Sequence, residues 1–487
     1  MSKLEEIKKM NLESERVFDY FEEICSIPHG SRNTKQISDY LVYFAKEHEL
    51  EVYQDESNNI VIVQPATVGY EAADPIIIQG HMDMVCEKES DHEIDFEKDG
   101  LDLYVDGDFL KARGTTLGGD DGIAVAYALA IMDSPEIAHP RLEVVITVDE
   151  EIGMLGAESI DLSMLKGHKM LNIDSDVEGH FLTSCAGGMT VETSIPVSYI
   201  KQAGQTVVVT IAGLEGGHSG SEIDKEHANA NIVMGRLLKY VSDRMEMGIV
   251  SLAGGLKDNA IPRECTAELL IPESKTDELS KLLENLEDIL KKEYAVSDPG
   301  IRIEVVLKET GEKEILSYSA MTKVIFYLRN VPNGVQHMSL IMPGLVETSL
   351  NAGIMQLGTE KLSIVSSVRS SVSTRKEELR DRLELLAEFL GGEIEVSGDY
   401  PAWEYKTDSD IRGTISSIYE ELFGEKPVFE AIHAGLECGL LSGKIENLDC
   451  VSFGPNNYDI HTPKERLSIS STEKIWKLLV EFLKRCK

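Results

Sequence analysis

The sequence is poor in cysteine, contains no long apolar run and is short of positive charge. Its seven cysteines are odd in number and form no C-x-x-C pair, which argues against a disulfide framework and favours reduced thiols in the cytosol. No segment approaches the ~18 apolar residues that a membrane span requires. The charged, amphipathic beginning of the chain also lacks the apolar core of a signal peptide. We therefore expect a cytoplasmic protein.

The deficit of basic residues is large, because 47 Lys and Arg residues face 85 Asp and Glu residues, for a formal net charge of −38 at pH 7. A field of this sign repels nucleic acid and anionic membranes, so we expect neither as a partner. The chain of 487 residues is 42% hydrophobic and 27% charged, which is the composition of a globular protein. Its length suggests two or three domains.

The two ends of the chain are expected to form one α/β domain, made of residues 1–187 and 400–487. In the first part, helical patterns alternate with strand-like runs at 59–64, 75–79, 142–148 and 170–174. A long apolar helix begins at Gly122. Strands that are apolar on both faces and alternate with helices are typical of a mostly parallel sheet.

The intervening segment, residues 188–399, has a different order of predicted strands and helices. Strand, helix and strand follow one another twice over, which predicts an inserted α+β lid domain and suggests two related halves within it. Two alternatives stay open for the assembly. An exposed edge strand of this domain could form a homodimer, or its second half could take the place of a partner.

Ionisable residues end several of the predicted apolar strands. His81 and Asp83 follow the run "IIIQG", and side chains two residues apart on an extended segment point to the same side. Further acids follow other strands or precede the long helix: Asp120, Asp121, Asp149, Glu150, Glu151, Asp174 and Asp176. Each of these, taken alone, also fits a solvated loop or a helix N-cap. Ligand sites in open α/β sheets gather at the carboxyl ends of strands, so the joint pattern predicts that the groups meet at one edge.

Carboxylates clustered at close range repel one another unless cations compensate them. Oxygen ligands combined with imidazole suit zinc, manganese or cobalt. His461 offers a second imidazole, in the loop "GPNNYDIHTPKERL" after an apolar strand, although a loop histidine alone is usually only an exposed side chain. The pattern therefore predicts a site for divalent metal ions.

The order of these motifs resembles the M20 metallopeptidase clan, and most closely its aminoacyl-histidine dipeptidase branch. The matching stretches are, in chain order, "GHMDMV", "RGTTLGGDDG", "TVDEEIGMLGA", "LNIDSD", "GGHSG", "ETSLNAG", "HAGLECG" and "SFGPNNYDIHTP". They run through essentially the whole chain. The resemblance implies a mostly parallel-sheet catalytic domain that holds two divalent metal ions, with zinc favoured over manganese and cobalt, and an inserted lid domain.

The resemblance also implies the roles of individual residues. The ligands would be His81 and Asp174 for one ion, Glu151 and His461 for the other, and Asp120 as the bridge between them. Glu150 would be the general base, and Asp83 would orient the imidazole of His81. Asp121 and Asp149 would not be ligands. Three carboxylates against two divalent ions leave a net positive charge that can polarise an amide carbonyl.

In the inserted domain, the resemblance implies that His218 of "GGHSG" supports the oxyanion, Arg369 binds the substrate's free carboxylate and Asn259 contacts the substrate. A glycine-rich turn, an ordinary strand arginine and a turn residue before proline are the plain alternatives. His218 lies outside the catalytic domain, so we expect a complete site only on domain closure or with help from a neighbouring subunit. Glu437 could meet the substrate's amino group or lie in the wall of the site.

The implied activity is hydrolysis of dipeptides with free termini, favouring Xaa-His substrates such as carnosine, by a hydroxide held on the metal ions with Glu150 as base. One alternative is another M20 activity: a broader dipeptidase, a tripeptidase or an N-acyl-amino-acid hydrolase. Another is a non-catalytic relative that binds metal or peptide without turnover.

Overall fold

The computed structural model describes residues 4–487, which divide into two compact units. The first unit contains the chain up to Ser184, Tyr405–Ala431 and Leu436–Lys487. The second contains Cys185–Glu404 together with the short segment Ile432–Gly435. The second unit is thus inserted in the sequence of the first, and the chain returns to it once more for four residues.

The first unit is built on a mixed eight-stranded sheet in the order β1-β2-β6-β3-β7-β21-β8-β20. Its four central strands are parallel: β6 (Leu142–Thr147), β3 (Ile76–His81), β7 (Lys169–Asn172) and β21 (Asp449–Ser452). Every residue of β3 and β6 is buried, as expected for strands covered by helices on both faces. The outer strands are β1 (Glu51–Gln54), β2 (Ile60–Gln64), β8 (His180–Cys185) and β20 (Val428–Ile432), of which β1, β2 and β8 pair antiparallel. The predicted α/β class is confirmed.

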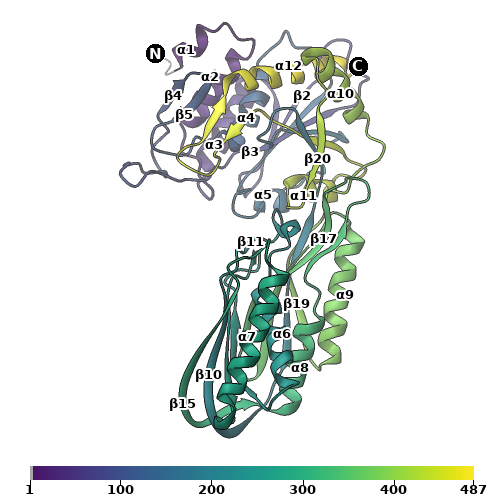
Figure 1. Ribbon diagram of the computed structural model, residues 1–487. Helices are drawn as coiled ribbons and strands as arrows, with labels where there is room; N and C mark the ends of the chain where they lie inside the picture. The colour runs from purple at the N-terminus through teal and green to yellow at the C-terminus, as the bar shows by residue number, and fades with distance from the viewer. Residues whose placement is uncertain (1–3) are drawn as a thin grey trace. The chain divides into compact units, whose positions relative to one another are not determined.

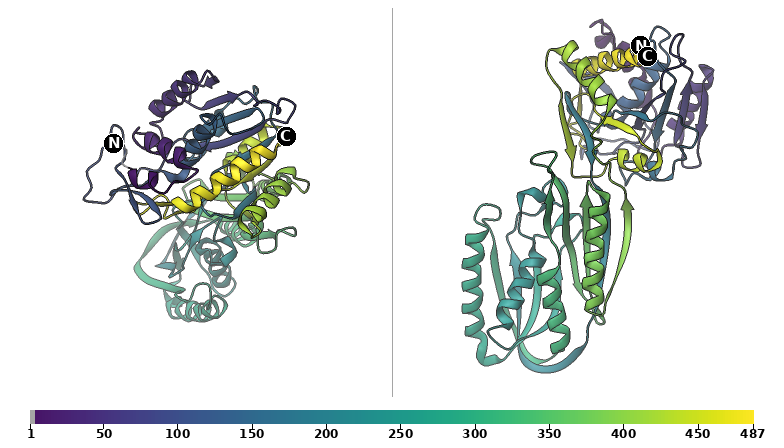
Figure 2. Two further views of the ribbon diagram at one scale, coloured as in Figure 1. Left: turned by 90° about the horizontal axis from the view of Figure 1, so that it is seen from above. Right: turned by 90° about the vertical axis from the view of Figure 1, so that its right-hand side faces the viewer.

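The helices of the first unit cover this sheet. They are α1 (Glu5–Lys8), α2 (Glu15–Cys25), α3 (Lys35–Glu47), α4 (Gly119–Met132), α5 (Leu155–Ser159), α10 (Asp410–Phe423), α11 (Glu437–Lys444) and α12 (Ile469–Arg485). The predicted apolar helix is α4, and it is buried from Asp121 to Met132 because it packs against both α2 and β3. The amphipathic α12, yellow in Figures 1 and 2, lies beside α10.

A small antiparallel sheet completes the first unit. Its strands are β22 (Asn457–Tyr458), β23 (Arg466–Ser468), β5 (Phe109–Ala112) and β4 (Leu103–Asp106), in that order. Since β22 and β23 pair with each other, the loop between them, which carries His461, is closed at its base by strand hydrogen bonds. This pairing fixes where the loop leaves and rejoins the domain.

The second unit is an antiparallel nine-stranded sheet covered by four helices. Its strands are β9 (Gly187–Pro196), β10 (Tyr199–Ala212), β12 (Gly248–Gly254), β14 (Cys265–Ile271), β15 (Arg302–Leu316), β16 (Gly334–Met338), β17 (Val346–Leu357), β18 (Lys361–Ser370) and β19 (Glu393–Tyr400). Figure 1 shows α6 (Ala230–Ser242), α7 (Thr276–Glu293), α8 (Tyr318–Asn330) and α9 (Ser373–Phe389) lying along it. A separate pair, β11 (Gly217–His218) and β13 (Ala260–Ile261), carries the "GGHSG" motif.

The strand order of this sheet is mirrored about its middle. The path runs β15-β10-β14-β12 and continues β17-β18-β9-β19. Along the chain, the first half contains β10, α6, β12, β14, α7 and β15. The second half contains the same kinds of element in the same order: β9, α8, β17, β18, α9 and β19. This arrangement is compatible with the two related halves that the sequence suggests, which stay a prediction.

No helix among residues 4–487 combines the length and the apolar character needed to cross a bilayer. No disulfide joins any of the seven cysteines, all of which lie in the described part of the chain.

Candidate metal centre and substrate-binding residues

The acidic motifs of the first unit meet at the carboxyl edge of its parallel strands. β3 ends at His81, whose register partner on β6 is Thr147, so the segment Asp149–Glu151 begins two residues beyond that point. β7 ends at Asn172, two residues before Asp174. Parallel strands end at one edge of a sheet, and this topology brings together groups that are far apart in the sequence, as predicted.

Two imidazoles flank the carboxylate of Asp120. His81 Nε2 lies 3.1 Å from Asp120 Oδ1, and His461 Nε2 lies 3.1 Å from Asp120 Oδ2. His81 Nε2 is also 3.8 Å from Asp174 Oδ1, while His461 Nε2 is 2.9 Å from Glu151 Oε1. The five residues therefore form two half-sites that share one carboxylate, with a separate oxygen turned towards each histidine.

The donor set fits divalent metal ions. Two ligand atoms that are each about 2.0–2.1 Å from one ion in tetrahedral geometry lie roughly 3.3 Å apart, close to the separations between these nitrogens and oxygens. Imidazole with carboxylate is a ligand combination that zinc, manganese and cobalt accept. Asp121 also comes within range of His81 and Asp174, but its Oδ2 accepts a hydrogen bond from the main-chain N–H of His81.

The acidic side chains of the site carry more negative charge than their protein neighbours balance, and this shifts their pKa values. Burial raises the pKa of Glu150 to about 8, with Glu437, Glu151 and Asp120 adding to the rise. Burial and the neighbouring Asp121 raise the pKa of Asp174 well above its ordinary value. Hydrogen bonds to Asp120 and Glu151 raise the pKa of His461 to about 10. Without a cation the cluster retains protons, and bound divalent ions would take their place.

Asp83 supports both His81 and Glu150 from behind the cluster. Its side chain is fully buried, and its carboxylate accepts hydrogen bonds from Ser31 Oγ (2.8 Å) and from the main-chain N–H of Glu150 (3.0 Å). The Nδ1 atom of His81 lies 2.9 Å from the main-chain carbonyl of Asp83 and 3.4 Å from its carboxylate. These contacts leave His81 Nε2 facing Asp120, which is the orientation that a metal ligand needs.

Glu437 is buried against β3 and β6, close to the acidic cluster. Its side chain is fully buried, and Oε2 accepts hydrogen bonds of 2.6 Å from both Gln79 Nε2 and Thr147 Oγ1. Burial raises its pKa to about 7. The sequence signal for this network is present but slight: Gln79 and Thr147 are polar residues inside otherwise apolar strands, where a polar side chain needs a buried partner.

In the second unit, His218 is held in one tautomer. Its Nδ1 accepts hydrogen bonds from the main-chain N–H groups of Gly220 and Ser221, both 3.2 Å away, so the ring proton resides on Nε2. Burial and the nearby Arg369 cation lower the pKa of His218, which keeps the ring neutral. Asn259 precedes the register partner of His218, and its carbonyl accepts from the N–H of Ser219 (2.9 Å). His218 thus offers a neutral N–H donor.

Arg369 is a cation without a carboxylate partner among residues 4–487. It lies on β18 opposite Gly188 of β9, and Gly188 lies opposite Tyr400 of β19. Because Gly188 has no side chain, the Tyr400 ring extends over it, and Arg369 Nη1 donates to the Tyr400 hydroxyl at 3.1 Å. The Nε of Arg369 is buried and has no hydrogen-bond partner in the described chain.

His433 lies near this arginine and was not predicted as a functional residue. Its Nε2 lies 2.7 Å from Ser349 Oγ, and burial together with the Arg369 cation lowers its pKa to about 3. Both histidines around Arg369 are therefore neutral at pH 7. Because these neighbouring histidines carry no charge, the guanidinium charge of Arg369 remains available to an anionic group of a ligand.

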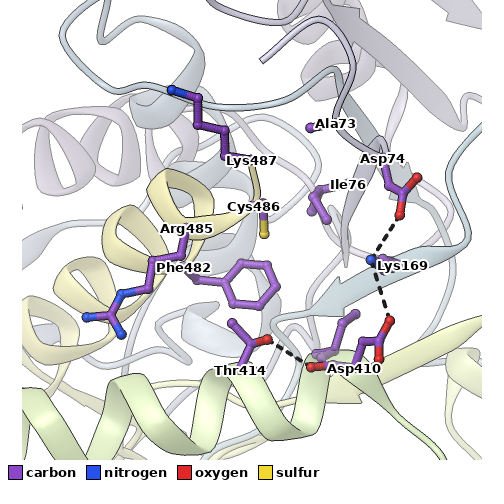
Figure 3. A pocket seen from close by; sticks show the side chains of 11 residues that line it. Ala73, Asp74, Ile76, Lys169, Asp410, Thr414, Phe482, Arg485, Cys486 and Lys487 are labelled. Atoms are coloured by element: carbon purple, nitrogen blue, oxygen red, sulfur yellow. Dashed lines mark hydrogen bonds and ion pairs between the residues drawn. The ribbon is translucent and has the colours of Figure 1, made fainter. Parts of the chain in front are cut away.

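A pocket of about 290 Å³ lies elsewhere in the first unit, at the amino ends of β3 and β7 (Figure 3). Lys169, its central cation, lies 3.0 Å from Asp74 and 3.9 Å from Asp410. Its charge is thus balanced within the protein. The pocket is at the opposite end of the strands from His81, so it is separate from the acidic cluster.

The sequence of the chain is similar to a characterised bacterial enzyme over nearly its full length. It is 36% identical over 475 residues to the cytosol non-specific dipeptidase of Escherichia coli strain K12, covering 97% of this chain and 98% of that protein. Among solved structures, the aminoacylhistidine dipeptidase from Vibrio alginolyticus matches with a TM-score of 0.90 and 35% identity, covering 97% of each chain. The aminopeptidase PepT from Bacillus cereus matches at a TM-score of 0.56 and 16% identity, covering 98% of this chain and 99% of that one, which shows a shared fold.

These matches confirm that the predicted enzyme class, a peptidase, is correct. The model of peptidase family M20/M25/M40 matches residues 77–485, a segment that contains every candidate site residue described above. The chain belongs to peptidase family M20/M25/M40.

Proposed function

We propose that this protein is a metal-dependent dipeptidase that hydrolyses dipeptides with free termini and favours Xaa-His substrates such as carnosine. The observation that carries the proposal is Asp120, which turns one carboxylate oxygen towards His81 and the other towards His461. The names of the relatives from Escherichia coli and Vibrio alginolyticus, both dipeptidases, support the substrate length. The name of the first also supports a cytoplasmic location.

His81 and Asp174 would hold one divalent ion, and Glu151 and His461 would hold another, with Asp120 as a ligand in both half-sites. We favour zinc and retain manganese and cobalt as alternatives. When bound, such ions polarise the scissile carbonyl and the attacking water. Their positive charge would also release the protons that burial now favours on Glu150 and Asp174.

Glu150 is the proposed general base. Its side chain is 19% exposed, so it borders solvent, while its main chain is fixed by the hydrogen bond to Asp83. As a carboxylate it accepts a proton from the attacking water, and as an acid it returns that proton to the leaving amine.

The second unit is proposed to bind the parts of the substrate that carry negative charge. Arg369 would bind the free carboxylate of the dipeptide, because its guanidinium donates to the Tyr400 hydroxyl but has no carboxylate partner within the described chain. His218 would donate its Nε2–H to the oxyanion that develops during attack, with Asn259 as a further substrate contact. Formation of a homodimer stays a prediction.

The test is a substrate panel assayed with zinc, manganese or cobalt. β-Alanyl-histidine, other dipeptides, tripeptides and acetylated amino acids should be compared by kcat/KM. Rapid hydrolysis of dipeptides alone supports the proposal, and a further preference for histidine at the second position supports the Xaa-His assignment. Equal rates for tripeptides or acetylated amino acids would favour a broader peptidase or an acyl-amino-acid hydrolase instead.

A further inference from the structure

Glu465 is a buried acid that ties together the two segments carrying Asp120 and His461. Its side chain is only 3% exposed. Its carboxylate accepts four consecutive main-chain N–H groups: Leu117 (2.7 Å) and Gly118 (3.1 Å) on Oε2, and Gly119 (2.8 Å) and Asp120 (3.4 Å) on Oε1. Asn457 Nδ2 adds a hydrogen bond of 3.1 Å to Oε1. No ordinary helix cap involves so many donors.

The sequence "LGGD" at 117–120 explains how four amides can point at one carboxylate. Gly118 has φ +70°, the left-handed conformation, and successive N–H groups in such a turn form a concave anion-binding nest. A Cβ on Gly118 would lie 2.8 Å from Met84 Sδ, and a Cβ on Gly119 would lie 2.8 Å from Asn457 Nδ2. Gly118 thus permits the left-handed turn, and a side chain at Gly119 would displace Asn457, which donates to Glu465.

Glu465 also belongs to the loop that carries His461. The two residues are four positions apart, within the loop that the β22–β23 pairing closes. His461 has φ +61°, a conformation that a non-glycine residue adopts only when its surroundings hold it there. The hydrogen bonds between Glu465 and the nest are such a restraint. They fix the end of the loop that carries His461 against residues 117–120, the last of which is Asp120.

We propose that Glu465 is a positioning residue for the metal centre, which sets Asp120 and His461 at the separation that an ion between them requires. The inference rests on the metal binding proposed above, and it adds a residue that does not itself touch metal or substrate. Two of the three ligands of the second half-site, Asp120 and His461, depend on this contact. The first half-site keeps His81 and Asp174 on the strand ends β3 and β7, so it depends on Glu465 less.

The test is metal affinity in the absence of substrate. Metal-free wild-type protein and the Glu465→Gln variant would be titrated with Zn²⁺ against a chromophoric chelator. Glutamine replaces one acceptor oxygen by an amide group that faces N–H donors, so two amides of the nest lose their partner. We expect the second Zn²⁺ to bind about 10- to 100-fold more weakly, the range found when groups supporting metal ligands are removed. The visible absorption of Co²⁺-loaded protein should change accordingly.

Glu143→Gln is the matched control, because Glu143 is also fully buried in the first unit and accepts from the main-chain N–H groups of Lys166 and Gly167. It lies near the amino end of β6, away from the metal edge. This variant should lose stability and keep both Zn²⁺ affinities. If Glu465→Gln does not fold, Glu465→Asp keeps the charge but is too short to reach all four amides, and the same weakening is expected.

Folded Glu465 variants that bind two Zn²⁺ ions within about twofold of wild type would overturn the inference. An equal loss in Glu143→Gln would also overturn it, because the effect would then be one of general stability. Wild-type protein that binds no metal at all would instead contradict the proposed function, so the two failures can be told apart.

Discussion

Replacing Arg369 by methionine should weaken the recognition of free-carboxylate dipeptides far more than that of their amides. Methionine keeps much of the length and the apolar contact of arginine but removes the charge. The expected size of the effect follows from the surroundings of the guanidinium, which has no carboxylate partner in the described chain and a buried Nε without a hydrogen bond. A hydrogen bond between charged groups contributes about 1.5–3 kcal/mol, so kcat/KM should fall about 10- to 150-fold.

The assay is a double comparison of two proteins and two substrates. Wild type and Arg369→Met would each be measured with a dipeptide and with the same dipeptide amidated at its carboxyl end. The amide lacks the anion, so wild type should already be slow with it and the substitution should change that rate little. Arg244→Met is the control in the same unit, because Arg244 is an arginine that stacks on Tyr240 and donates to a main-chain carbonyl.

Tyr400→Phe should give a smaller loss in the same direction, since it removes only the hydroxyl that accepts from Arg369 Nη1. A neutral hydrogen bond contributes about 0.5–1.5 kcal/mol, or about two- to tenfold in KM with kcat nearly unchanged. Equal losses of kcat/KM for the free and amidated dipeptides in Arg369→Met would refute the reasoning. A charge that binds the carboxylate should affect only the dipeptide that carries one.

Glu150→Gln should keep two equivalents of metal by elemental analysis and lose about 10²- to 10⁴-fold in kcat, and substantial residual turnover would remove Glu150 as base. His218→Ala should lower kcat at constant metal content, and depleted metal would instead make His218 a ligand. Acid should destabilise the second unit through His433: its pKa of about 3 in the folded state lies below the ordinary value near 6.5, so the unfolded state binds the extra proton. Between pH 6.5 and 5 the free energy of unfolding should fall by about 2 kcal/mol, and this decrease should be absent in His433→Asn.

The sequence predicts the metal-site candidates because their geometry follows from topology alone. His81 and Asp174 each lie at or just beyond the end of an apolar strand, and parallel pairing of β3 with β7 brings those ends together without any side-chain information. The apolar helix expected from Gly122 is also present, as α4 (Gly119–Met132), because a long run of apolar residues is readily recognised in the sequence.

The supporting contacts of Glu465 and Glu437 could not be predicted because they depend on tertiary burial. Glu465 lies in the polar run "HTPKER", which reads as a solvated loop, and only the nest formed 345 residues earlier shows why a carboxylate is there. Glu437 is similar, since its donors Gln79 and Thr147 come from strands that are distant in sequence. His433 belongs to the four-residue segment that returns to the second unit, and no local sequence pattern predicts this return.

The charge of Arg369 in the second unit suits the carboxylate end of the proposed substrate. The first unit concentrates carboxylates that need cations, while the second holds an arginine flanked by neutral histidines. A protein with a net charge of −38 repels a peptide carboxylate at long range, so binding requires a local cation that no protein acid neutralises. Arg369 has this property, and introducing an acid beside it should abolish the preference. Ser349→Asp, at the register partner of Arg369 on β17, should therefore raise KM for free dipeptides and leave amidated ones unaffected. If KM rises equally for both, local charge at Arg369 does not determine the selectivity.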